Sequence, residues 1–398
     1  MRTGPFMLLC ATGLFAIFSS TISKSPVLPI FAAYLGADPS GVGFIASVSA
    51  FTGVLASIPA GIVSDHLGKR KMLVFSTVVF STAPFLYLFV TSIWQLALVR
   101  FYHGLATAIF IPVAMALVSD LFHKERGEKM GWFSTATLLG RFMAPIIGGG
   151  IIGLLVYNPA LSYRVVYIVC AMAGIITLLM AIKIPASTEM KKETRSREET
   201  VRAFKTVIAD KGIVVTALVE ASILFAYGTF ETFLPLYSLK AGRSPYEVGL
   251  FLSSQVITLA LMKPLMGRFS DRHGRQPQIF FGALIGSFCI AGFSFFKAFL
   301  PLLLFSILFG FSLSIVTSAT SACIADLSES KGRGSAMGIL GSIMDIGHTT
   351  GPLISGIVAT SFGIEISFIG ASLVVLTVAV VFSFTIGISK ASGRGTMY

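Results

Sequence analysis

Long apolar runs recur along the whole chain, and short polar breaks separate them. Each run reaches the ~20 residues that an α-helix needs to cross the hydrocarbon core of a bilayer. Charged residues make up only 12% of the 398 residues, against about 25% in soluble domains. A water-soluble fold could not cover its surface with so little charge, so we expect lipid to be the solvent.

The runs predict twelve membrane-spanning helices and therefore an all-α membrane protein. The expected helices cover, in chain order, roughly residues 6–34, 41–63, 72–92, 95–119, 131–155, 163–183, 213–238, 246–268, 278–297, 300–324, 335–358 and 364–388. The first run follows Arg2, as the apolar part of a signal peptide would. It continues to Tyr34 without a clear small-residue cleavage site, so we expect it to be a retained helix.

One long polar stretch divides the expected helices into two groups of six. It predicts a linker at residues 185–211, between an N-terminal six-helix bundle at 1–184 and a C-terminal six-helix bundle at 212–398. The charges of this stretch have mixed sign. A plain tether is the simpler interpretation, and a regulatory or partner site is the alternative.

Basic residues gather in alternate breaks between the expected helices, for example at 69–71, 124–129 and 268–275. The positive-inside rule assigns these breaks, and with them both termini, to the cytoplasm. A net charge of +12 would suggest a nucleic-acid partner in a soluble protein, but no basic stripe with interleaved aromatic residues is present. We expect a multi-pass protein of the cell membrane, whose partners are the bilayer and a small molecule and not nucleic acid.

The four cysteines all fall inside apolar runs, and none has C-x-x-C spacing. This pattern predicts neither a disulfide framework nor a metal site. We interpret the cysteines as small apolar side chains.

The two halves of the chain are copies of one unit. The segment GIVSDHLGKR begins at Gly61 and the segment GRFSDRHGRQ begins at Gly267, an offset of 267 − 61 = 206 residues. Farther along, GRFMAPIIGG at Gly140 matches GHTTGPLISG at Gly347, with an offset of 207. Each unit holds six expected helices, so the copies share one orientation and are related by an axis along the membrane normal.

Twelve spans, a six-plus-six repeat and a long central cytoplasmic loop resemble the major facilitator superfamily over essentially the whole chain. The most specific motif is the cytoplasmic turn G-x-x-x-D-x-x-G-[RK] after the second helix of each half. The resemblance implies the major facilitator fold, with a cytoplasmic gate at this turn whose partner layer is formed by Asp120 with Arg126 and by Asp326 with Arg333. The implied gating residues are Gly61, Asp65, Gly68, Arg70, Asp120, Arg126, Gly267, Asp271, Gly274, Arg275, Asp326 and Arg333.

Two further motifs resemble functional motifs of that superfamily. Arg100, His103 and Gly104 match R-x-x-[QH]-G, which the family links to proton coupling, and Ser306 replaces the arginine in the second half. The fifth helix resembles the G-x-x-x-G-P-x-x-G-G motif of exporters, drug/proton antiporters above all, with Ala144 in place of one glycine. The motif and its copy in the eleventh helix predict helix kinks and close helix contacts at Gly140, Pro145, Gly148, Gly149, Gly347, Gly351, Pro352 and Gly356.

Ionisable residues at membrane depth are expensive and usually functional. The candidates for substrate or proton binding are Lys24, Arg100, His103, Arg141, Glu220, Glu231, Asp345 and His348, with Lys263 as a further candidate that more often serves as an anchor. Lys24 and Glu231 fall at the same level of the two halves, so we expect a breakable salt bridge, with a static ion pair as the alternative. Glu231 is the first choice for the protonated carboxylate and Asp345 the second.

The predicted function is a secondary transporter that exports a small, lipophilic or drug-like molecule against protons. Uptake of a metabolite remains the alternative. No G-x-x-x-x-G-K-[ST] loop is present, so we expect the proton gradient, and neither ATP nor a bound cofactor, to supply the energy. A membrane enzyme is disfavoured because no H-x-x-x-x-D or D-D-x-x-D cluster occurs, and a channel because no filter-like loop enters the membrane. We expect the protein to be a monomer.

Overall fold

The computed structural model describes residues 3–122, 125–185, 209–327 and 333–391. Within these ranges the regular elements are helical. The first half of the chain forms α1 (Thr3–Ile22), α2 (Val27–Tyr34), α3 (Pro39–Leu67), α4 (Lys69–Tyr87), α5 (Ile93–Leu121), α6 (Arg126–Leu154) and α7 (Pro159–Ile182). The second half forms α9 (Lys211–Lys240), α10 (Pro245–His273), α11 (Arg275–Phe293), α12 (Phe299–Leu327), α13 (Arg333–Phe362) and α14 (Ile364–Ala391).

Eleven of the twelve predicted helices are present as single helices, most of them a few residues longer than predicted. The prediction of one continuous helix over residues 6–34 is wrong. Residues 23–26 form a break between α1 and α2, although both helices belong to one apolar span. Pro26 explains the break, because proline cannot donate a helical hydrogen bond and disfavours a helical conformation in the residue before it.

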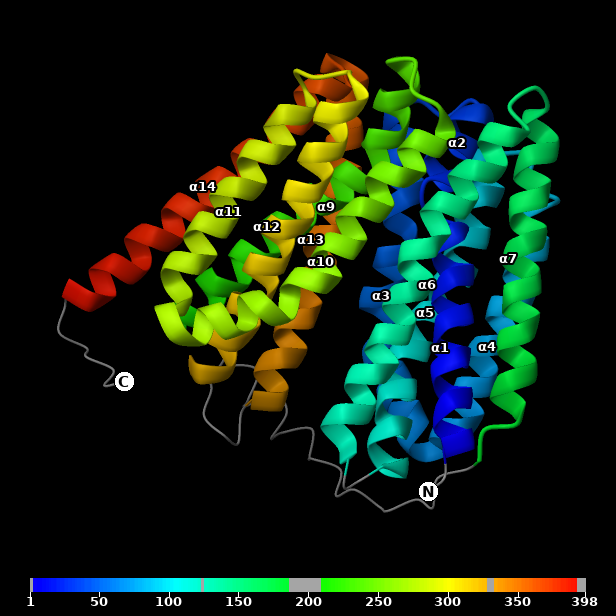
Figure 1. Ribbon diagram of the computed structural model, residues 1–398, viewed down its shortest axis with the longest axis horizontal. Helices are drawn as coiled ribbons and strands as arrows, with labels where there is room; N and C mark the ends of the chain where they lie inside the picture. Colours follow the sequence, from blue (N-terminus) through cyan, green and yellow to red (C-terminus); the bar gives the residue numbers. More distant parts are fainter. Residues whose placement is uncertain (1–2, 123–124, 186–208, 328–332, 392–398) are drawn as a thin grey trace.

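The helices form two bundles that pack against each other (Figure 1). The first contains α1 to α7 and the second α9 to α14, and each has its own core of buried apolar side chains. Contacts between the bundles run mainly through α3 against α13 and α6 against α10. Of the predicted linker, residues 186–208 lie outside the described residues, and α9 begins at Lys211.

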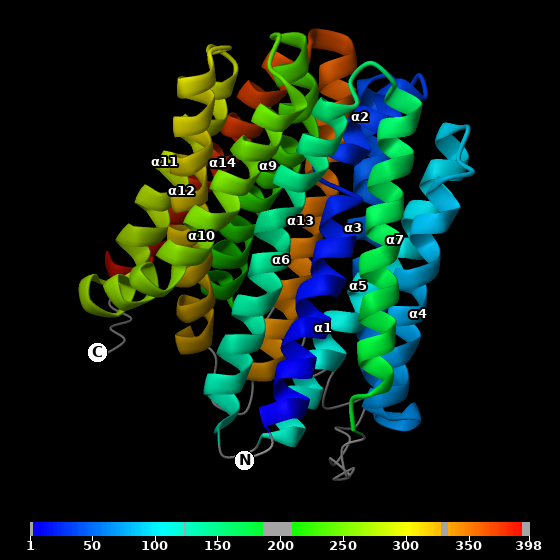
Figure 2. The ribbon, with the colours of Figure 1, turned by 45° about the vertical axis from the view of Figure 1, so that its right-hand side comes forward.

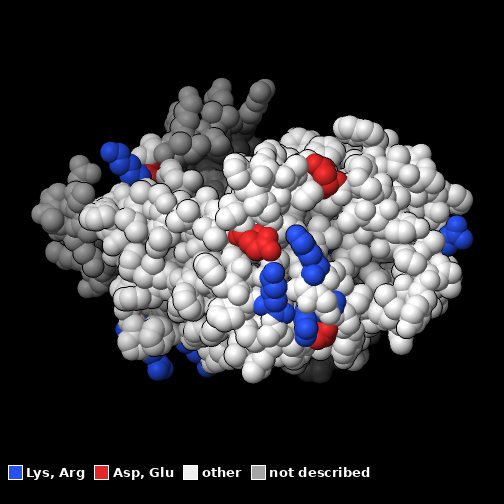
Figure 3. Space-filling model, turned by 90° about the horizontal axis from the view of Figure 1, so that it is seen from above, with Lys and Arg blue, Asp and Glu red and all other residues white. Residues whose placement is uncertain are grey.

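The two bundles approach each other at one end of the molecule and diverge toward the other (Figures 1 and 2). The N-terminus and the end of α14 lie on the diverging side, which we call the terminal side. The opposite end is the closed side. Seen face-on, the closed side carries only a few separated acidic and basic side chains among uncharged ones (Figure 3).

The motif turns on the terminal side depend on glycine. Gly68 connects α3 to α4 with φ +93°, and Gly274 connects α10 to α11 with φ +89°. Residues with a Cβ rarely adopt these backbone angles, so glycine permits each helix to end and the next to begin at once. The two turns occupy equivalent places in the two bundles, as the 206-residue offset requires.

Candidate functional site

The break between α1 and α2 presents a lysine to the opposite bundle. Lys24 Nζ lies 2.7 Å from Glu231 Oε2 of α9. Glu231 is buried, and the side chain of Lys24 is 24% exposed. The two residues face each other as the sequence predicted, and they join the two halves of the protein. Loss of one partner of a buried ion pair leaves an uncompensated charge, which costs about 3–5 kcal/mol.

A histidine extends the ion pair within the second bundle. His348 Nε2 of α13 lies 3.4 Å from the same carboxylate oxygen of Glu231. Its ring stacks on Tyr227 of α9, with 5.4 Å between ring centroids. One carboxylate oxygen therefore faces two basic groups, one from each half. A proton that moves to Glu231 would remove the charge that holds both contacts.

A second polar cluster lies inside the first bundle beside the break. Arg100 Nη1 donates to Tyr87 Oη at 3.2 Å and to Ser23 Oγ at 3.4 Å. His103 Nδ1 lies 3.4 Å from both of these hydroxyl oxygens. Arg100 and His103 are each 2% exposed, so the R-x-x-H-G motif contributes two buried basic groups to one site. Because Ser23 precedes Lys24, the helix break connects this cluster to the ion pair.

The remaining candidates are more dispersed. Glu220 of α9 is buried, and its Oε2 accepts a hydrogen bond from Thr320 of α12 inside the second bundle. Lys263 of α10 interacts electrostatically with Glu220. Arg141 of α6 is exposed and acts electrostatically on Lys24. These residues stay predictions for substrate or proton binding.

Asp345 of α13 is half-buried and faces α3. Its Oδ2 lies 4.0 Å from the position that a Cβ on Gly53 would occupy. The contacts described for His348 are made to Glu231 and Tyr227, although it shares a helix face with Asp345. Asp345 therefore lies at the interface of the two bundles, and its role also stays a prediction.

Two equivalent ion pairs lie at the gating motifs on the terminal side. Asp120 of α5 pairs with Lys69 at the start of α4, and Arg126 is exposed, so the gating role of Asp120 with Arg126 stays a prediction. In the second half, Arg275 Nε lies 2.8 Å from Asp326 Oδ2. The 206-residue offset relates the two pairs to each other, since 69 + 206 = 275 and 120 + 206 = 326. This equivalence was the signal that could have identified Lys69.

Other gating residues add to this arrangement or lie outside the description. Arg70 donates hydrogen bonds of 2.7 Å to the carbonyl oxygens of Ile182 and Ile184, which tie α4 to the end of α7. Arg275 also lies 3.5 Å from Asp271 one turn earlier. The surroundings of Gly61 and the side chains of Asp65 and Arg333 lie outside the described residues.

Reciprocal glycine–proline contacts join the two bundles at the closed side. We call each set of these contacts between two helices a seam, and the first seam joins α6 and α10. A Cβ on Gly249 of α10 would lie 2.3 Å from the carbonyl oxygen of Pro145, and a Cβ on Gly149 of α6 would lie 2.3 Å from that of Pro245. The equivalent seam joins α3 and α13. There, a Cβ on Gly43 would lie 2.2 Å from the Pro352 carbonyl oxygen. A Cβ on Gly356 would lie 2.8 Å from the Pro39 carbonyl oxygen.

The other motif glycines pack inside their own bundles. A Cβ on Gly140 would lie 2.4 Å from the Leu14 carbonyl oxygen, and one on Gly347 would lie 2.2 Å from that of Ala221. A Cβ on Gly351 would lie 2.2 Å from the Phe225 carbonyl oxygen of α9, and one on Gly148 would lie 3.1 Å from the Val27 side chain of α2. In each motif, glycines on one face of the helix therefore pack inside their own bundle. Glycines on the other face contact the opposite bundle.

Hydrogen bonds join α3 to α13 at the closed side of the molecule. We call this group of Asp38, Ser40 and Thr360 the latch. The backbone N–H of Ser40 donates to Thr360 Oγ1 at 2.9 Å, and Thr360 donates to Asp38 Oδ2 at 3.3 Å. Asp38 also accepts bonds from Gly41 N and Ser40 Oγ, and these bonds lower its pKa below the ordinary value of 3.8. The contribution of a carboxylate with a lowered pKa is present above the ordinary pKa and is lost only as pH falls through the lowered one. The latch should therefore not respond to pH between about 5 and 8.

We expect Thr360→Val to loosen this latch, since the valine cannot bond to Ser40 or Asp38. A lost hydrogen bond of about 0.5–1.5 kcal/mol shifts the equilibrium by about 2- to 10-fold toward a state in which α3 and α13 are separated at the closed side. Spin-label distances between the ends of α3 and α13 measure the shift. Thr385→Val is the matched control, because Thr385 bonds only within its own helix in the described structure. Equal distances in both variants would contradict the latch.

Comparison with known proteins adds a family and a fold to this geometry. A model described as "Major Facilitator Superfamily" matches residues 8–244 and 238–395. An uncharacterized MFS-type transporter of Methanocaldococcus jannaschii is 27% identical over 343 residues, which cover 85% of this chain and 87% of the relative. Multidrug resistance protein 2 of Bacillus subtilis is 22% identical over 335 residues, which cover 83% of each chain.

A solved structure shares the fold. It is that of a bacterial homologue of the human lysosomal transporter Spinster, in an inward-facing and occupied conformation. It superimposes with a TM-score of 0.83 at 15% sequence identity, and the match covers 100% of this chain and 99% of that one. The likeness extends over both bundles.

Proposed function

The chain belongs to the Major Facilitator Superfamily, and from that premise we propose that it exports a small, lipophilic or drug-like molecule in exchange for protons. It is a transporter rather than an enzyme, and it is a multi-pass protein of the plasma membrane. The observation that carries the proton coupling is the buried ion pair between Lys24 and Glu231, which joins the two halves.

Alternating access is supported by where the halves touch. The glycine–proline seams and the latch hold the halves together on the closed side, and the bundles diverge on the terminal side (Figure 1). The positive-inside rule places the terminal side, with both termini, in the cytoplasm. In this orientation the bundles diverge toward the cytoplasm, and we propose that a molecule binds from that side before it is carried outward.

Proton coupling is supported by the chemistry of the ion pair. Glu231 is negatively charged when it binds Lys24, and protonation removes its attraction to Lys24 and to His348. Separation of the halves at this level must break the contact between Glu231 and Lys24. Proton binding and movement of the halves are thereby linked, because a proton binds more tightly to the state in which the pair is already broken.

Two observations support export. The α6 motif resembles that of exporters, and its Pro145 and Gly149 form the α6–α10 seam. The matched relative from Bacillus subtilis is named for multidrug resistance. We propose further that one chain is the working unit, since the ion pair and both seams are complete within it. We propose no bound cofactor and no nucleic-acid partner.

Dye efflux tests the direction and the energy source. Cells that lack their own pumps and express this protein are loaded with ethidium, with and without a protonophore. We expect lower dye accumulation than in vector-only cells, and we expect the protonophore to abolish the difference. Higher accumulation in expressing cells would indicate uptake and contradict the proposal. A difference that survives the protonophore would contradict proton coupling.

A further inference from the structure

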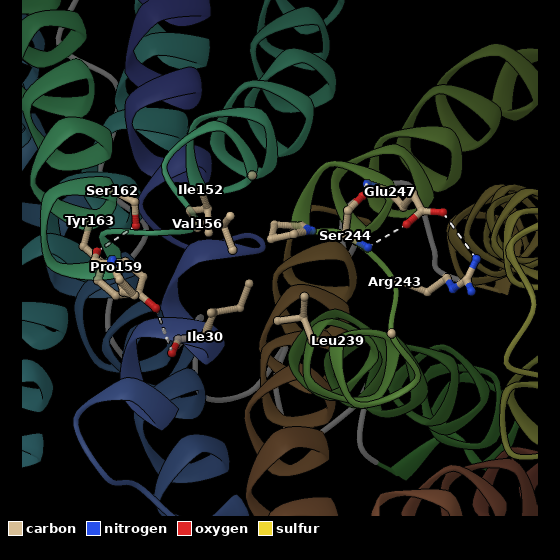
Figure 4. Close-up of a pocket in the computed structure, with 13 residues that line it drawn as sticks. Ile30, Ile152, Val156, Pro159, Ser162, Tyr163, Leu239, Arg243, Ser244 and Glu247 are labelled. Atoms are coloured by element: carbon tan, nitrogen blue, oxygen red, sulfur yellow. Dashed lines mark hydrogen bonds and ion pairs between the residues drawn. The ribbon is translucent and has the colours of Figure 1, made fainter.

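A pocket of about 490 Å³ lies on the closed side between the two bundles (Figure 4). One wall comes from α2, the end of α6 and the segment after it, and includes Ile30, Ile152 and Val156. The other wall comes from the end of α9, the start of α10 and the segment between them, and includes Leu239 and Pro245. Its volume falls within the ~300–1,000 Å³ of small-molecule sites. None of the ionisable candidates described above lines it.

The polar side chains of the pocket wall bond to one another or to backbone groups, except for Arg243 Nε, which is buried without a hydrogen-bond partner among the described residues. The guanidinium of Arg243 points away from the pocket toward Glu247, 3.5 Å from its carboxylate (Figure 4). Ser244 and Glu247 form a capping box at the start of α10. Ser162 donates to the carbonyl oxygen of Pro159, and Tyr163 donates to that of Ile30. A ligand in this pocket would therefore meet hydrocarbon rather than free donors or acceptors.

The pocket borders the α6–α10 seam. Pro245 lines the pocket, and its carbonyl oxygen contacts Gly149 in that seam. Gly153, one helical turn after Gly149, also lines the pocket and lies against Tyr246 of α10. Any movement that opens the seam must pull the two pocket walls apart. The pocket is accessible at its rim, where Val156 is 51% exposed.

From these observations we infer that the pocket binds a small, uncharged, apolar molecule that holds the closed side shut and so inhibits transport. The bound molecule contacts both bundles, and a ligand that prefers one conformation increases the population of that conformation. The same hydrocarbon chemistry is available from a free molecule and from a lipid acyl chain. In the orientation proposed above the pocket faces the outside, so a free molecule can reach it without entering the cell.

Photolabelling in lipid nanodiscs tests the binding site. The probe is phenyl trifluoromethyl diazirine, a small uncharged aromatic molecule, and mass spectrometry locates the labelled residues. We expect labelling on both walls, at 152–156 and near Leu239. Val156→Trp and Leu239→Trp should each weaken it about tenfold, the loss expected when roughly two buried methylene groups of the ligand are displaced. The two variants change opposite walls, so one can decide if the other fails to fold.

Leu154→Trp is the matched control, because Leu154 lies two residues before Val156 at the end of α6, is 84% exposed and does not line the pocket. Equal labelling in the control and in both wall variants would show general labelling of the lipid-facing surface and would overturn the site. A second arm carries the diazirine on the acyl chain of phosphatidylcholine. Labelling by that lipid alone identifies an acyl chain as the ligand, and labelling by the free probe identifies a free molecule.

Transport measurements test the inhibition separately. Unphotolysed probe should slow substrate transport by the wild-type protein and by Leu154→Trp, and should slow the two wall variants about tenfold less effectively. Equal inhibition of all four proteins would overturn the link between pocket and seam. The labelling requires no transport, so a failed efflux assay leaves the binding result interpretable, and a failed labelling experiment leaves the proposed export standing.

Discussion

Glu231→Gln is expected to abolish proton-driven transport. The glutamine retains the size of the side chain but carries no charge and cannot exchange a proton, so Lys24 remains without the partner that lies 2.7 Å away in the wild type. The uncompensated lysine should destabilise the fold by about 3–5 kcal/mol. Substrate flux in proteoliposomes with an imposed pH gradient measures the coupling, and thermal unfolding in detergent measures the stability.

A double variant separates these two effects. Lys24→Met combined with Glu231→Gln removes both charges, so it should recover most of the lost stability while transport stays uncoupled from protons. Glu365→Gln is the control, since it removes a carboxylate at the first turn of α14, away from this ion pair. If the single variant keeps pH-driven flux, the proton is not carried by Glu231, and Asp345→Asn becomes the variant to test.

Gly249→Ala is expected to prevent the closed side from closing. The added methyl group would lie 2.3 Å from the carbonyl oxygen of Pro145, which is backbone and cannot rotate away. Overpacking of about 1–3 kcal/mol would shift the equilibrium away from the closed arrangement by about 5- to 150-fold. Spin-label distances across the α6–α10 seam should lengthen, and the transport rate should fall in parallel. Gly43→Ala should likewise lengthen the distances across the α3–α13 seam and slow transport.

Gly131→Ala is the matched control for this prediction. Gly131 lies on α6, the helix that packs against α10, but nothing lies within 4 Å of the position of its Cβ. We expect normal distances and normal transport in this variant. Unchanged distances in both Gly249→Ala and Gly43→Ala would contradict a closed side that depends on backbone contact. Changed distances with normal transport would show that the seams do not limit the transport cycle.

The repeat in the sequence predicts more of the site than the motifs do. An offset of 206 residues relates the pair of Lys69 with Asp120 to the pair of Arg275 with Asp326, and both pairs are present. Asp120 pairs with Lys69 in the structure, while Arg126 lies exposed at the start of α6. Spacing along a turn does not say where a side chain points.

The first span contains a helix break that the hydropathy of the sequence does not predict. Its apolar run is continuous from residue 6 to Tyr34, and continuous runs are what hydropathy detects. Pro26 was visible in the sequence, but prolines also occur inside α3, α4 and α5 without a break. Whether a proline only bends a helix or ends it depends on what the freed backbone groups contact, which is a tertiary property.

The sequence by itself determined the solvent, the helical elements, the two copies and the level at which Lys24 and Glu231 lie. These features follow from apolar run length and from a constant offset, both of which are linear along the chain. Only the tertiary structure decided that His348 joins this pair, that Arg100 bonds to Tyr87, and that Gly149 and Gly356 contact prolines of the opposite half. Such contacts depend on helix rotation, helix tilt and side-chain conformation. Those variables are set by packing between residues that can lie more than 200 positions apart, as Lys24 and Glu231 do.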